Sequence, residues 1–222
     1  MSQSTALKPI QIDTGDIDSL LSRMHDLDGP GIGHTAHTRL RYLGKIGFPA
    51  SAKAGRGKRS VHDLPAVLKL ATVFEMLDLG TVPSRAVATV NGNWPELRDA
   101  FSGAWQALQR SRSNAPGIGA TRDERAAHRE LQVEQHRTII VLSPRSLAGS
   151  DSDPLTLATT SLEAERSVLK GSRRGSRARA IIDPYAIVSD LEKELEQELR
   201  YRKDEVAAAF DALRSQIDEL AA

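Results

Sequence analysis

The residues best suited to chemistry in this sequence are the basic side chains between His37 and Val61. That stretch holds seven lysine and arginine residues and no acidic one: Arg39, Arg41, Lys45, Lys53, Arg56, Lys58 and Arg59. Clustered positive side chains bind phosphate, and arginine can also form hydrogen bonds with base edges in the major groove of DNA. We therefore expect a DNA-binding surface here. The alternative is a solvated basic face followed by a flexible loop.

Two elements would have to position these side chains. A helix is predicted first, because apolar residues recur at spacings of three and would form one buried face: Leu40, Leu43 and Ile46. Gly47 is placed to end this helix, and the following Phe48-Pro49 opposes its continuation. A basic loop of small residues, 50–58, comes next and has two glycines near its tip. A short basic helix followed by a flexible basic loop is how a winged helix meets DNA.

The predicted roles differ between the helix and the loop. In the helix, Arg39 and Arg41 are candidates for contact with base edges or nearby phosphates, and Lys45 for contact with phosphate. Tyr42 can donate its hydroxyl to a phosphate, although a half-buried packing role is an equal alternative. The loop residues lie among glycines and small side chains, which suits contact with the DNA backbone: Lys53, Arg56, Lys58 and Arg59.

Within this stretch, Leu40-Arg41-Tyr42 followed by Lys45-Ile46-Gly47 resembles the LRYYEKIGL signature of the MerR family of bacterial transcription regulators. The resemblance covers roughly residues 17–92, since a basic loop, an apolar helix and a short second helix follow in the family's order. Leu43-Gly44 replaces the family's aromatic and acidic pair, and the N-terminal helix is acidic. The resemblance implies a winged helix-turn-helix domain and dimerisation through a C-terminal helix.

The elements around the basic stretch follow from apolar spacing and capping residues. A helix over 17–24 precedes it, with Asp13 or Asp16 as its N-cap. Asp63 is a good N-cap for a strongly apolar helix over 64–79, which Gly80 would end. Two further helices are predicted over 83–90 and 96–108, and residues 109–121 have the composition of a linker.

The C-terminal half is predicted to contain a small sheet and one long helix. Residues 138–142 have the composition of a buried strand, and two further strands are predicted within 155–162 and 178–182. A helix from Pro184 to about Leu220 should follow. Its apolar residues are spaced by four up to Leu199 and by alternating fours and threes from Val206. The second spacing is typical of a coiled-coil seam, so we expect this acidic amphipathic helix to pair with a second copy.

The other candidate sites are weaker. His34 and His37 have the spacing of a metal pair, but the chain has no cysteine and residues 29–62 contain no acidic residue to complete a site. A basic run over 166–179 is expected to be an exposed loop, with nonspecific phosphate or RNA contact as the alternative. No arrangement of nucleophile, base and acid can be identified from spacing. We therefore expect no catalytic residue, no metal and no cofactor.

Charge distribution indicates more than net charge does. The net charge is only +1, yet residues 37–62 carry seven basic side chains and no acidic one, while residues 184–222 carry five basic and ten acidic side chains. Such segregation is expected where some surfaces face a polyanion and others face water or a partner. No signal peptide and no apolar run of membrane-spanning length is evident, so a cytoplasmic, nucleoid-associated protein is expected.

The predicted fold is mainly α. It comprises a winged helix-turn-helix domain over 1–108, a linker over 109–121, a small α/β segment over 122–183 and a C-terminal dimerisation helix over 184–222. The predicted function is a homodimeric, sequence-specific transcription regulator that binds double-stranded DNA and is not an enzyme. RNA polymerase or an unknown effector would be a further partner. Two alternatives remain open: a nonspecific nucleoid or mobile-element architectural protein, and an interaction module or enzyme carried by residues 122–222.

Overall fold

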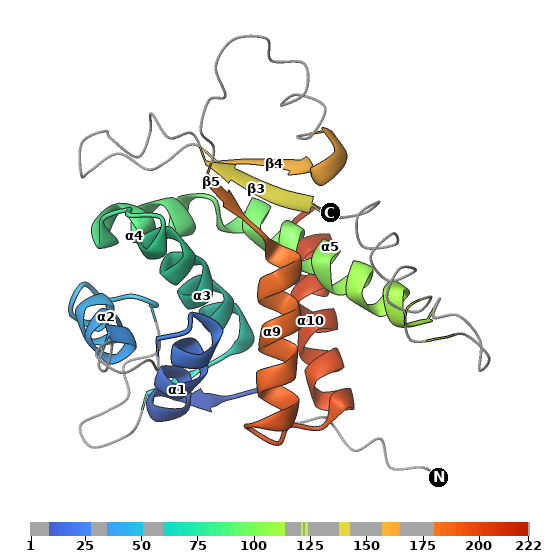
Figure 1. Ribbon diagram of the computed structural model, residues 1–222, viewed down its shortest axis with the longest axis horizontal. Helices are drawn as coiled ribbons and strands as arrows, with labels where there is room; N and C mark the ends of the chain where they lie inside the picture. Colours follow the sequence, from blue (N-terminus) through green and yellow to red (C-terminus); the bar gives the residue numbers. More distant parts are fainter. Residues whose placement is uncertain are drawn as a thin grey trace.

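A computed structural model describes most of the chain, namely residues 9–27, 35–50, 60–113, 121, 123, 138–142, 157–164 and 180–221; the side chains of Thr35 and of residues 216–221 are outside this description. The chain is mainly helical, with two small antiparallel sheets (Figure 1). The elements in order are β1 (Ile12–Asp13), α1 (Thr14–Met24), α2 (Thr35–Lys45), β2 (Val61–His62), α3 (Leu64–Asp78), α4 (Pro83–Gly92), α5 (Trp94–Ser113), β3 (Thr138–Leu142), β4 (Leu157–Ser161), β5 (Ala180–Ile182), α9 (Pro184–Gln197) and α10 (Lys203–Ala221).

Capping residues fix the ends of α1 and α3. The Asp13 carboxylate accepts hydrogen bonds from the first backbone N–H groups of α1, and the Asp63 carboxylate accepts one from Ala66 in α3. Gly80 follows α3 with φ of +84°, a left-handed conformation that favours glycine. The N–H of Thr81 then donates to the carbonyl of Met76 at 2.9 Å, which closes the end of the helix. The predicted ends of α3 are confirmed to within one residue, whereas α1 begins at Thr14, three residues before its predicted start, with Asp13 as its N-cap.

The helix predicted over the first part of the basic stretch is α2. Gly47 has φ of +78°, and the N–H of Phe48 donates to the carbonyl of Leu43 at 2.9 Å, so the helix ends where the sequence predicts. Leu43 is buried and Leu40 packs against the core, but the side chain of Ile46 is 41% exposed. The prediction of a three-residue buried face is wrong at Ile46, because each step of three residues falls about 60° short of a full helical turn.

A two-stranded ladder brings the chain before α1 beside the chain that follows the basic stretch. Ile12 pairs with His62 and Asp13 pairs with Val61, in antiparallel register. The Thr14 hydroxyl also donates to the carbonyl of Ser60 at 3.2 Å. The Ser60 end of the basic segment is thereby held close to the N-terminus of α1.

The predicted small sheet is present and is wholly antiparallel. Its strand order is β4-β3-β5, and all three strands lie within the predicted ranges. It lies at one end of the molecule, near α5 and the start of α9 (Figure 1). Ile140, Leu142 and Ile182 belong to the same hydrophobic core as residues of α1, α3, α5 and α10. The segments predicted as separate units therefore share one core. Their predicted limits stay predictions, although residues 109–113 of the expected linker continue α5.

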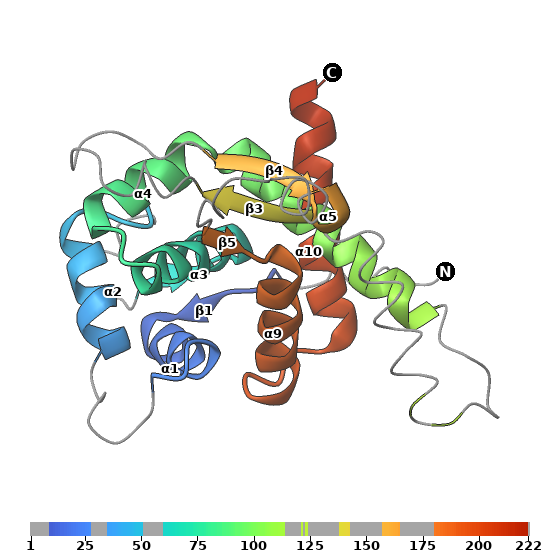
Figure 2. The same cartoon turned by 45° about the horizontal axis from the view of Figure 1, so that its top comes forward.

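The prediction of one long C-terminal helix is wrong, since the chain forms two helices. Between α9 and α10, Arg200 has φ of +60°, and the N–H of Tyr201 donates to the carbonyl of Leu195 at 2.9 Å. The N–H of Arg202 donates to the Glu205 carboxylate at 2.9 Å, which begins the next helix. The two helices lie side by side and both pack on α5 (Figure 2).

The apolar stripes explain this fold-back. One straight helix could not bring both stripes to the same core, so each half buries its own stripe against the chain: Ile187, Leu191 and Leu195 from α9, and Val206, Phe210 and Leu213 from α10. The first three residues of the expected seam from Val206 to Leu220 therefore pack in the core of their own chain. Its last two, Ile217 and Leu220, have side chains outside the described residues.

Candidate nucleic-acid interface

The helix α2 lies at the edge of the molecule, beside α1 (Figure 1). Among its described side chains only Ala36 and Leu43 are buried, and Leu40 is partly buried against the core. Most of its surface therefore faces solvent. The helix contains no acidic residue, and its last turn carries Lys45.

Three of the four predicted helix contacts lie on this exposed surface. Arg41, Tyr42 and Lys45 are all exposed, and Tyr42 keeps 46% of its surface accessible although it is aromatic. Arg41 and Lys45 are four residues apart, so their side chains project from one side of the helix with Tyr42 beside them. This arrangement places two cations and a hydroxyl donor together, which is the chemistry that binds a phosphate backbone or base edges.

Arg39, the fourth predicted contact, points toward the body of the protein. Its Nη1 donates to Oδ1 of Asp78 at 2.6 Å, and its guanidinium carbon lies 5.5 Å from the centre of the Phe74 ring. Only 23% of the Arg39 side chain is exposed. The two predicted base-contacting arginines are thus placed differently, since Arg41 faces solvent and Arg39 is bound to α3.

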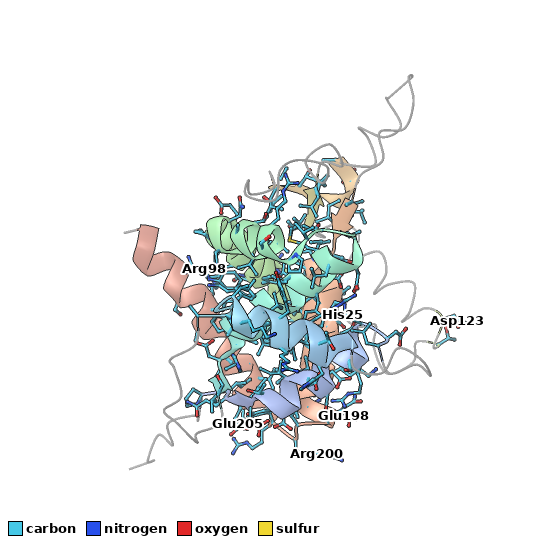
Figure 3. The ribbon with its side chains drawn as sticks, turned by 90° about the vertical axis from the view of Figure 1, so that its left-hand side faces the viewer. His25, Arg98, Asp123, Glu198, Arg200 and Glu205 are labelled. Carbon is cyan, nitrogen blue, oxygen red and sulfur yellow. The ribbon has the colours of Figure 1, made fainter. Side chains whose placement is uncertain are left out.

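His25, directly after α1, completes this group of side chains. Its Nδ1 lies 2.9 Å from Oδ2 of Asp78, its ring is 5.3 Å from that of Phe74, and only 3% of its side chain is exposed (Figure 3, in which α2 faces the viewer). Burial lowers the pKa of His25 below 6.5, and the nearby Asp78 carboxylate only partly opposes this effect. A neutral imidazole donating its Nδ1–H to Asp78 satisfies this geometry.

Sequence reasoning missed Asp78, although one local signal points to it. Asp78 is the last residue of α3, and a negative charge at a helix C-terminus is unfavourable because it lies beside the negative end of the helix dipole. No basic residue occupies the last turn of α3 to offset it. The groups that compensate Asp78, the His25 imidazole and the Arg39 cation, lie 53 and 39 positions away in the sequence, so only the fold identifies them.

The predicted loop contacts, Lys53, Arg56, Lys58 and Arg59, lie outside the described residues. A cavity of about 870 Å³ lies between α1, α2 and β2, and residues that flank this segment in the sequence belong to its lining. Its lining includes the acidic Asp18 and the basic Arg41, so it has no single charge that selects a ligand. His62 also lines it and is 7% exposed, and burial lowers its pKa below 6.5.

Two further observations concern other classes of site. Among the described side chains, no group of three His, Asp or Glu residues is placed to hold a metal ion. Of the helices in the described ranges, none combines the length and the hydropathy that crossing a bilayer needs.

Searches against protein-family models, curated proteins and solved structures found no match to this chain. The resemblance to the MerR family therefore rests on the residues quoted for it.

Proposed function

We propose that this chain is a sequence-specific DNA-binding transcription regulator that presents α2 to the major groove. The observation that carries the proposal is the exposed, acid-free surface of α2, where Arg41, Tyr42 and Lys45 lie together. A helix of this kind fits the major groove, and its arginine can hydrogen-bond to base edges while its lysine contacts phosphate.

The surrounding elements support a winged helix-turn-helix of the MerR type. α1 packs against α2, as the first helix of such a motif packs against its recognition helix. The β1–β2 ladder holds the end of the basic segment next to α1, which is where a wing would end. The order of helix, basic helix, basic segment and apolar helix agrees with the resemblance between residues 17 and 92.

Pairing of two copies stays a prediction. A homodimer would place two α2 helices in successive major grooves of a palindromic site. The described seam residues of α10 are buried within their own chain, so an interface would have to use other surfaces. Light scattering of the full chain at several concentrations measures the mass directly, and a monomer at all concentrations would remove this part of the proposal.

Selection from a random duplex library tests the proposed function. The full chain should enrich one sequence, and that duplex should outcompete bulk DNA by roughly 10³-fold or more at physiological salt. Binding without enrichment would favour the nonspecific architectural protein, because phosphate contacts alone carry no sequence information. No binding to any duplex would favour an interaction module or enzyme built on residues 122–222.

A further inference from the structure

One carboxylate connects three helices of the N-terminal part. Asp78 at the end of α3 accepts a hydrogen bond from Arg39 of α2 on Oδ1, and Oδ2 lies 2.9 Å from Nδ1 of His25, the residue after α1. Each oxygen therefore binds a different helix. The Phe74 ring, one turn earlier in α3, lies beneath both partners, 5.5 Å from the Arg39 guanidinium carbon and 5.3 Å from the His25 ring centre.

This connection matters because the other described contacts of α2 are few: Leu40 packs partly buried against the core, and Nδ1 of His37 lies 3.2 Å from Oδ2 of Asp18 in α1. Its two fully buried side chains are Ala36, which is small, and Leu43, which lies near the C-terminal end of the helix. Ile46, just beyond that end, is 41% exposed. A helix held by so little apolar area can tilt or rotate unless polar contacts restrain it. Arg39 lies in the middle of α2, so its ion pair restrains the helix at a point between Ala36 and Leu43.

We propose that Asp78 is a positioning residue for DNA recognition, which fixes the orientation of α2 relative to α1 and α3 by binding Arg39 and His25. The inference rests on the proposed function, with Arg41, Tyr42 and Lys45 as the DNA contacts. Arg39 then acts through Asp78, not through DNA. Base contacts require placement within about 0.5 Å, so an unrestrained α2 loses base contacts more than it loses phosphate attraction.

Amide hydrogen exchange of the full chain tests the restraint without DNA. Asp78→Asn removes one charge of the pair with almost no change in size, and Arg39→Gln removes the other with a shorter side chain that also leaves the Phe74 ring. Both variants should raise the exchange of the α2 amides about five-fold relative to those of α5, the effect expected from one partly exposed charged hydrogen bond. Glu75→Gln is the matched control, because Glu75 is on the same helix and lies 3.9 Å from His25 without a bond to Arg39. It should leave α2 exchange unchanged.

DNA binding by the same variants separates positioning from a merely structural role. At a temperature where circular dichroism shows every variant folded, Asp78→Asn should weaken binding to the selected duplex about ten-fold and to a scrambled duplex less than two-fold. A role in stability alone would lower the melting temperature and leave both affinities unchanged, which would overturn the proposal.

The salt dependence then assigns Arg39. Each phosphate contact contributes about 0.9 to the slope of log K against log salt concentration. Arg39→Gln should keep the wild-type slope; a slope reduced by about 0.9 together with unchanged α2 exchange would make Arg39 a DNA contact and overturn the proposal. A wild-type chain that binds no duplex overturns the proposed function and with it the DNA role of Asp78. The exchange data still decide whether Asp78 restrains α2.

Discussion

Replacing Phe210 with alanine tests whether the apolar seam of α10 belongs to the core of one chain. The Phe210 ring is fully buried and stacks on Trp105 of α5, with ring centres 4.5 Å apart and planes inclined by 11°. Truncating a buried phenylalanine costs about 3–5 kcal/mol, of which the aromatic pair accounts for about 1 kcal/mol. We therefore expect Phe210→Ala to lower the free energy of unfolding by about 4 kcal/mol.

The assay is urea denaturation followed by tryptophan fluorescence, repeated at protein concentrations spanning a hundred-fold. Because Phe210 is buried within its own chain, the loss should be the same at every concentration. For a chain of this length about 4 kcal/mol corresponds to a fall of roughly 10 °C in melting temperature. Arg214→Ala, an exposed position one turn further along α10, is the control and should change stability by less than about 0.5 kcal/mol. A loss below about 1 kcal/mol, or one that grows on dilution, would place the seam in an interface between chains.

Three other predictions concern stability. Burial lowers the pKa of His25 and His62, so the unfolded chain takes up protons below pH 6.5 that the folded chain excludes. The free energy of unfolding, measured by urea denaturation at each pH, should therefore fall as pH drops from 7 to 5.5. The fall should be smaller in a His25→Gln variant. Gly80→Ala should cost about 1 kcal/mol in melting experiments because φ there is +84°, and no loss would refute the left-handed helix end. Arg112→Gln should lower the free energy of unfolding by about 2 kcal/mol in urea denaturation, because the carboxylate of Glu192, which is 3% exposed, loses its two charged hydrogen bonds. No change in that free energy would mean that water replaces these hydrogen bonds.

Elements with local signals could be predicted from the sequence. Asp63 and Gly80 mark the two ends of α3 because a cap and a left-handed glycine act within one turn. The strand over Thr138–Leu142 is a short β-branched run between polar segments, and its limits agree with β3. The exposed placement of Arg41 also follows from its position relative to the buried Leu43.

Features set by distant residues could not be predicted. The break near Arg200 contains neither glycine nor proline, and it forms because the two apolar stripes share one core. The change of register between Leu199 and Val206 was the one local trace of it. In the candidate interface, helical spacing places Arg39 on the side of the buried Leu43 and Arg41 on the opposite side, but the partner of Arg39, Asp78, is 39 positions away and could not be predicted.

Recognition of a DNA sequence by the exposed surface of α2, as proposed above, can be tested directly. The most direct measurement is the ratio of dissociation constants for a scrambled and a selected duplex, at one salt concentration, for the wild type and Arg41→Ala. Arg110→Ala, an exposed arginine on α5, is the control and should leave the ratio unchanged. We predict a wild-type ratio of roughly 10³ or more, reduced about 10- to 100-fold by Arg41→Ala, because one base contact contributes about 1–3 kcal/mol of discrimination. A wild-type ratio near one, or a ratio that Arg41→Ala leaves unchanged, would contradict the claim.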